Sequence, residues 1–134
     1  MKYSRIPQDE LEKLEKEFVD FLVVNGITAE DWVSLKENEP INASKIVDQF
    51  SDVVWESILR STKYLNKVEK DLAYYFFYGN KEISLIRVKK IDSDRIEKQT
   101  STKHYNKVRE LEMFEMIQNG CTVSDGEEFI SLTE

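Results

Sequence analysis

The fold of this chain is decided by the aromatic stretch YYFFY at residues 74–78, which is followed by the pair Gly79-Asn80 and the segment ISLIRV at residues 83–88. Aromatic residues favour pleated strands, where large rings pack against neighbouring strands and layers. Glycine and asparagine are typical of a tight turn between two strands. Because side chains alternate between the two faces of a strand, consecutive rings make both faces of the sheet apolar. We therefore expect a β-hairpin that is packed on both sides.

Three helices are expected before the strands. The first covers residues 7–25, since leucine and phenylalanine recur there at spacings of three and four, and Gly26 can adopt the left-handed conformation that ends a helix. Thr28 can cap a short second helix, which Pro40 closes. The third helix covers residues 42–60 and has an apolar face broad enough to be buried on two sides.

The rest of the chain is expected to supply the sheet and one more helix. Residues 62–90 predict an antiparallel meander of about three strands, while residues 89–102 hold few apolar side chains and are interpreted as a loop. A fourth helix is expected from Lys103 to Gly120. The tail after it is expected to form a short strand or a docked helical turn. The pattern predicts a single α+β domain over residues 1–134, with three N-terminal helices and one C-terminal helix packed on the sheet.

Charge is spread unevenly along the chain, whose net charge is −7. Residues 1–60 carry 7 basic and 13 acidic residues, and residues 110–134 carry 7 acidic residues and no basic one. The basic segment 87–109 carries 8 basic and 3 acidic residues, a net charge of +5. An acidic protein repels nucleic acid as a whole, yet a basic segment can form one local phosphate-binding face. Neutralisation of acidic helices in the same or a second copy is the other explanation.

The sequence predicts a cytoplasmic protein that does not interact with membranes. Cys121 is the only cysteine, so no disulfide forms within the chain. The opening residues lead into a charged segment, not the apolar run of a secretory signal. No apolar run is long enough to span a bilayer.

Four short segments are similar to known sequences. They are the opening Met1-Lys2-Tyr3, FSDVVWE at residues 50–56, EISLI at residues 82–86, and LEMF at residues 111–114 continuing to Ile117 and Gly120. In this order they resemble a family of short acidic bacterial proteins with a domain of unknown function. This chain is shorter than the family's pattern between Val88 and the last helix. The resemblance implies one α+β domain and supplies no catalytic residue.

No arrangement typical of an enzyme is recognisable, and we expect no catalytic residue, cofactor or metal ion. His104 and Cys121 are separated by the whole predicted fourth helix, so a solvated histidine and an apolar cysteine explain them better than a nucleophilic pair. Asp92 and Asp94 resemble the opening of a calcium loop, but a third oxygen ligand and the turn glycine are missing. A surface turn is the better interpretation.

The leading hypothesis is a non-enzymatic module for protein–protein interaction or self-association, with a symmetric homodimer as the commonest form. It is motivated by the apolar surplus on the third helix and the hairpin. The alternative is a binder of nucleic acid or another anionic ligand, since tyrosines on a sheet can stack bases while basic residues hold phosphates. The acidic net charge and the missing RNA-reading motif disfavour nucleic acid. The residues of this alternative site are Arg87, Lys89, Lys90, Arg95, Tyr74 and Tyr78, with Lys98, Lys103 and Lys107 as further candidates.

Overall fold

The computed structural model describes all residues from Met1 to Glu134 and confirms an α+β fold. Two units divide the chain, Met1–Ser57 and Ile58–Glu134. The first is helical, and the second contains every strand. None of the helices combines the length and the apolar content needed to cross a lipid bilayer. The single domain expected over the whole chain stays a prediction.

Four helices, not three, precede the sheet, because the helix expected over residues 7–25 is broken at Leu14. Their bounds are α1 (Gln8–Lys13), α2 (Glu15–Val24), α3 (Ala29–Asn38) and α4 (Pro40–Ser61), whose last turn belongs to the second unit. Leu14 has φ −103° and ψ 23°, which lies outside the helical range. Neither proline nor glycine marks this position, so the sequence pattern contains no signal for the break.

Pro40 begins α4, although we expected it to close the helix before it. Proline suits the first helical position, because the N–H that it lacks would have no partner in the first turn. The preceding helix, α3, has already ended at Asn38. Its predicted cap is confirmed: Thr28 Oγ1 accepts a hydrogen bond from the backbone N–H of Asp31 at 3.0 Å. The carboxylate of Asp31 accepts one from the N–H of Thr28 at 3.2 Å, which completes a capping box.

Aromatic rings fill the centre of the first unit and join α2, α3 and α4. The ring centroid of Phe18 lies 5.0 Å from that of Phe50 and 5.1 Å from that of Trp32, both edge to face. The centroid of Phe21 lies 5.4 Å from that of Phe50. Edge-to-face contact is favoured because the positive ring edge meets the negative ring face. Phe50 is accordingly among the most buried residues of the chain.

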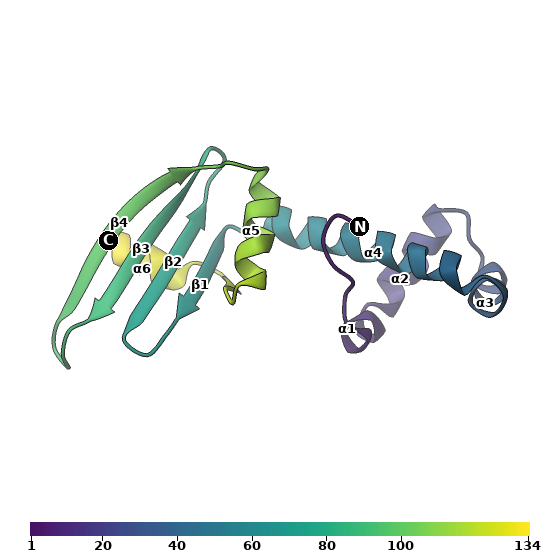
Figure 1. Ribbon diagram of the computed structural model, residues 1–134, viewed down its shortest axis with the longest axis horizontal. Coiled ribbons are helices and arrows are strands. Elements are labelled where there is room, and N and C mark those ends of the chain that lie inside the picture. Colours follow the sequence, from purple (N-terminus) through teal and green to yellow (C-terminus); the bar gives the residue numbers. More distant parts are fainter. The chain divides into compact units, whose positions relative to one another are not determined.

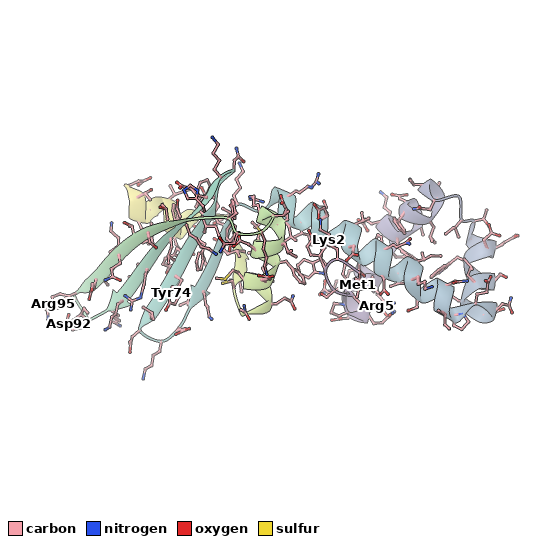
Figure 2. The ribbon with its side chains drawn as sticks, turned by 45° about the horizontal axis from the view of Figure 1, so that its top comes forward. Met1, Lys2, Arg5, Tyr74, Asp92 and Arg95 are labelled. Carbon is pink, nitrogen blue, oxygen red and sulfur yellow. The ribbon has the colours of Figure 1, made fainter.

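The segment before α1 is held along α4 by backbone hydrogen bonds (Figure 2). The N–H groups of Lys2 and Tyr3 donate to the carboxylate of Asp52 at 2.8 and 2.9 Å. The N–H of Ile6 donates to the buried hydroxyl of Ser51 at 3.1 Å. These side chains satisfy backbone groups that an extended segment would otherwise leave unpaired.

Five antiparallel strands form the sheet of the second unit, in the order β4-β3-β2-β1-β5 (Figure 1). Their bounds are β1 (Tyr64–Val68), β2 (Leu72–Tyr78), β3 (Glu82–Lys90), β4 (Ile96–His104) and β5 (Thr122–Ser124). The predicted hairpin is confirmed, because β2 pairs with β3 and the N–H of Gly79 donates to the carbonyl of Glu82 at 3.0 Å. Residues 62–90 supply three of these strands, as expected, and β4 and β5 extend the sheet with residues outside that range.

The loop expected over residues 89–102 is wrong, since most of it belongs to the end of β3 and to β4. Every residue of β4 is exposed, so the strand has no buried face to produce an apolar alternation. The helix expected from Lys103 therefore begins later, as α5 (Arg109–Gln118). The tail contains both of the structures that the sequence left open, the strand β5 and the helix α6 (Glu127–Thr133).

The helices α5 and α6 lie on opposite faces of the sheet (Figure 1). We call these faces the α5 face and the α6 face. Tyr78 points to the α5 face and is 2% exposed. Its neighbour Phe77 points to the α6 face, where its ring centroid lies 6.0 Å from that of Phe129. The aromatic stretch therefore packs against a helix on each side, as the sequence predicted.

Candidate functional site

The two edges of the sheet differ in length and exposure. β5 is a strand of 3 residues, whereas β4 has 9 residues and is exposed along its whole length. β4 neighbours only β3, so its other side presents backbone donors and acceptors without a partner strand. Natural sheets usually avoid such an edge by keeping it short, covered or bulged. The outer side of β4 is therefore a candidate site for an added strand.

The ladder between β3 and β4 identifies the residues of β4 that face outward. The N–H of Lys90 donates to the carbonyl of Asp71 on the β2 side, and the N–H of Ile91 donates to the carbonyl of Arg95 on the β4 side. Because backbone groups alternate along a strand, the odd-numbered residues of β4 bond to β3. The outward-facing residues, each with one N–H and one C=O, are Ile96, Lys98, Thr100, Thr102 and His104.

Contacts within the fold hold β4 at both ends. At the turn from β3, the carboxylate of Asp92 accepts from the N–H groups of Asp94 and Arg95, both at 2.9 Å, and from Nε of Arg95 at 2.8 Å (Figure 2). The hydrogen bond from Arg95 lowers the pKa of Asp92. This is the predicted surface turn. At the other end, Nζ of Lys103 donates to the carboxylate of Glu112 at 2.9 Å. A strand held in this way loses little further freedom when a partner binds.

Glu112 is a buried carboxylate of α5. Besides Lys103, it accepts hydrogen bonds from the backbone N–H groups of Asn106 at 3.0 Å and Lys107 at 3.4 Å. Burial acts to raise its pKa, but the Lys103 ammonium and the backbone donors outweigh burial and lower the pKa below its usual value. The ionised carboxylate therefore fixes the chain between β4 and α5, which is a structural role.

Three residues of the predicted anion site come together on the α5 face. Tyr74 lies opposite Arg87 in the pairing of β2 with β3, and Lys89 follows on the same face. The ring of Tyr74 stacks beside that of Phe76, with 6.4 Å between centroids and 13° between planes. Both rings are half-buried. Arg87 donates to the side chain of Gln99 at 2.9 Å. Half-exposed rings beside a guanidinium can stack a planar group and bind a phosphate.

The other predicted residues of that site lie elsewhere. Lys90 points to the α6 face, because side chains alternate along β3. Arg95 lies at the tip of the β3–β4 hairpin, away from Tyr74 (Figure 2). Tyr78 is buried, and burial raises its pKa. Lys98 and Lys107 already have partners within the fold, on α6 and α5.

His104 and Cys121 have the environments that the sequence predicted for a solvated histidine and an apolar cysteine. His104 is exposed at the end of β4, and Cys121 is buried after α5. Burial raises the pKa of the Cys121 thiol, whereas a nucleophilic cysteine needs a lowered one. No group of three or more histidine, cysteine, aspartate or glutamate side chains is placed to hold a metal ion.

Both units contain cavities, and the second unit has further ones between α6 and the sheet and along β3 and β4. The cavity of the helical unit has a volume of about 480 Å³ and is lined mainly by apolar side chains, among them Leu11, Phe18, Trp32, Pro40 and Val47. The cavity between α5 and the sheet has a volume of about 320 Å³ and is lined by residues that include Phe76, Ile83, Leu85, Lys103 and Met116.

The chain belongs to a family of unknown function (DUF6495), whose model matches residues 1–95 and 88–134 and so covers the whole chain. This confirms the resemblance to a family whose domain has no known function. The two matched segments overlap at residues 88–95, around the end of β3 and its turn to β4. No curated protein and no solved structure matches the chain.

Proposed function

We propose that this member of the DUF6495 family is a non-enzymatic interaction module that binds a protein partner by adding a strand to β4. The observation that carries the proposal is an edge strand of 9 residues that is exposed along its whole length. In strand addition, backbone hydrogen bonds supply affinity, and alternate side chains supply specificity. The cytoplasmic location expected from the sequence stays a prediction.

The backbone ladder supplies enough free energy for weak binding only. The outward residues Ile96, Lys98, Thr100, Thr102 and His104 offer about ten backbone groups, and each hydrogen bond contributes about 1 kcal/mol net. The sum of about 10 kcal/mol is similar to the roughly 4–15 kcal/mol that association costs. The side chains of β4 must therefore decide which strand pairs with it.

A proline on the outer side of β4 tests the proposal. Thr100→Pro removes an N–H that faces outward, and it leaves the bonds to β3 in place, as edge strands tolerate. Thr100→Ala is the matched control, because it shortens the same side chain and keeps the N–H. Circular dichroism and thermal unfolding establish that both variants are folded.

The probe is a labelled peptide with the sequence of residues 96–104, in which glutamine replaces Glu97 and Lys103 so that it tests backbone pairing without those charges. We expect the peptide to bind the wild type and T100A and to slow amide exchange at Lys98, Thr100 and Thr102. T100P should bind at least about tenfold more weakly, since it loses a central hydrogen bond. Equal binding by folded T100P and T100A overturns the proposal, as do outward amides that stay unprotected at millimolar peptide.

A second candidate function is binding of single-stranded RNA or another anionic ligand on the open part of the α5 face. The pairing of Tyr74 with Arg87, beside the half-exposed ring of Phe76, favours it. The test measures the binding of labelled RNA at low salt to the wild type and to Tyr74→Ala. Tyr75→Ala, on the opposite face of the sheet, is the control. We expect only Y74A to weaken binding, with an affinity that falls steeply as salt rises. RNA that does not bind the wild type at low salt removes nucleic acid as the ligand.

A further inference from the structure

We infer that the strand added to β4 is β4 of a second copy, paired antiparallel about a two-fold axis at Thr100. This inference rests on the proposed function and names its partner. Thr100 is the middle residue of Ile96–His104. An axis at this residue therefore pairs the two strands along their whole length.

The backbone geometry of β4 fits this register. Two residues of an antiparallel pair exchange hydrogen bonds only if both face the partner strand. About an axis at Thr100, even-numbered residues meet even-numbered residues, and these are the ones that face outward. Thr100 meets Thr100 of the second copy, and Lys98 meets Thr102. Ile96 meets His104, so every outward N–H and C=O of both strands finds a partner.

The charges of β4 are complementary in the same register. Glu97 lies opposite Lys103 of the second copy, and symmetry repeats this pair on the other side of the axis. Both residues occupy positions without mutual backbone hydrogen bonds, where Cα atoms approach to about 4.5 Å and side chains are closest. Opposite charges at such positions stabilise strand pairing. Both side chains are exposed, and the ammonium of Lys103 keeps donors free beside its bond with Glu112.

The neighbouring registers lack this agreement. An axis at Gln99 places Lys103 opposite Arg95, which brings two positive charges together. An axis at Ser101 places Lys103 opposite Gln99 and leaves Glu97 beyond the end of the partner strand. Either shift also leaves outward backbone groups at the strand ends unpaired. Full overlap and opposite charge thus select the same register by separate criteria.

The resulting assembly closes at two copies. The joined sheet has β5 at both outer edges, and a strand of 3 residues offers little to a further copy. The contact is isologous, so the same residues serve both copies. The alternative role of Lys98 and Lys103 is to keep edges apart, as lysines do on many natural edge strands. The oligomeric state of charge variants distinguishes the two roles.

Sedimentation equilibrium of the full chain tests the inference with Glu97→Lys. We expect a dimer for the wild type and about thirtyfold weaker dimerisation for E97K, because two attractive pairs become repulsive. Glu69→Lys makes the same charge change in the exposed turn between β1 and β2 and should dimerise like the wild type. The Lys103→Glu variant should also dimerise more weakly than the wild type. An equimolar mixture of E97K and K103E should form a heterodimer, in which each lysine at position 97 or 103 again lies opposite a glutamate.

A cross-linking test avoids the contact between Lys103 and Glu112. A Thr100→Cys variant should be joined between copies by a short thiol-specific cross-linker, because hydrogen-bonded partners have Cα atoms only about 5.5 Å apart, while their Cβ atoms are too far apart for an unstrained disulfide. Lys98→Cys is the control, since its equivalent in the second copy lies about four residues, or roughly 13 Å, away along the strand. Both variants keep the buried Cys121.

The outcomes separate this inference from the proposed function. A wild-type chain that is monomeric at several hundred micromolar, while the peptide without the charges of Glu97 and Lys103 still protects the outward amides, overturns self-pairing and leaves strand addition standing. Equal cross-linking by T100C and K98C shows that the register is wrong. Amides that stay unprotected under all conditions overturn both.

Discussion

The ammonium of Lys103 lies 2.9 Å from the carboxylate of Glu112, and this ion pair connects the end of β4 to α5. Lys103 thus has a fixed place at the sheet edge before any partner binds. In the register proposed here, the same side chain would face Glu97 of a second copy. A preorganised charge loses less side-chain entropy on association than a free one.

Glu112→Gln is expected to lower the free energy of unfolding by about 1–3 kcal/mol at pH 7, since a buried carboxylate with several donors is replaced by an amide. The pKa of Glu112 is lowered in the folded state from a usual 4.5. Its contribution is therefore present above the usual value and is lost as pH falls through the folded value. Urea unfolding at pH 7 and in acid should show a steeper loss for the wild type than for E112Q. Glu115→Gln, on the surface of the same helix, is the control, and equal losses would contradict the prediction.

Arg109→Lys is expected to destabilise the second unit by about 2–4 kcal/mol, because a lysine cannot reach several carbonyls at once. The guanidinium donates to the carbonyls of Leu59 at 3.0 Å, Thr62 at 2.5 Å and Tyr78 at 3.2 Å. Thermal and urea unfolding measure the loss. Arg87→Lys, on the half-exposed part of the sheet, should have a small effect by comparison, and similar values for the two variants would argue against the role of Arg109.

Gly126→Ala is expected to be more damaging than Gly120→Ala. Both glycines have a positive φ, of 87° and 106°, so alanine is strained at each. A Cβ on Gly126 would also meet the ring of Tyr64 at 2.5 Å, whereas a Cβ on Gly120 has only Lys67 Cε, at 3.9 Å. We expect a loss of about 1 kcal/mol for G120A and of at least 1 kcal/mol more for G126A, because the ring must move. A reversed order in urea unfolding would show that this contact relaxes freely.

Asp52→Ala is expected to release the segment before α1. Its carboxylate accepts from the N–H groups of Lys2 and Tyr3, so the variant leaves both without that acceptor. Amide exchange at Tyr3 should become faster, and stability should fall by about 1–2 kcal/mol. The exposed Asp20→Ala on α2 is the control. Unchanged exchange at Tyr3 in D52A would show that packing alone holds the segment.

Local patterns predicted the parts of the fold that have buried apolar faces. The hairpin of β2 and β3 followed from rings that alternate between faces around Gly79, and the cap of α3 followed from Thr28. β4 was missed because no face of it is buried. Its residues are nearly all polar, so the sequence shows no alternation of apolar and polar side chains and resembles a loop. The break at Leu14 has no proline or glycine to announce it.

The sequence likewise showed which residues belong to the candidate sites but not how they are arranged in space. The basic segment and the aromatic stretch were visible in the sequence, but only strand pairing places Arg87 beside Tyr74 and separates both from Lys90 and Arg95. Likewise, the sequence showed Glu97 and Lys103 as two scattered charges. Their position on one face of a free edge depends on the register between β3 and β4.

The spacing of apolar residues and rings along the chain thus established an α+β fold with an aromatic hairpin at its centre, because buried side chains recur with the period of the helix or strand that carries them. The tertiary structure decided which strand lies at the edge and which backbone groups have no partner strand. Those properties depend on contacts between residues far apart in the sequence, and such contacts leave no local period to read.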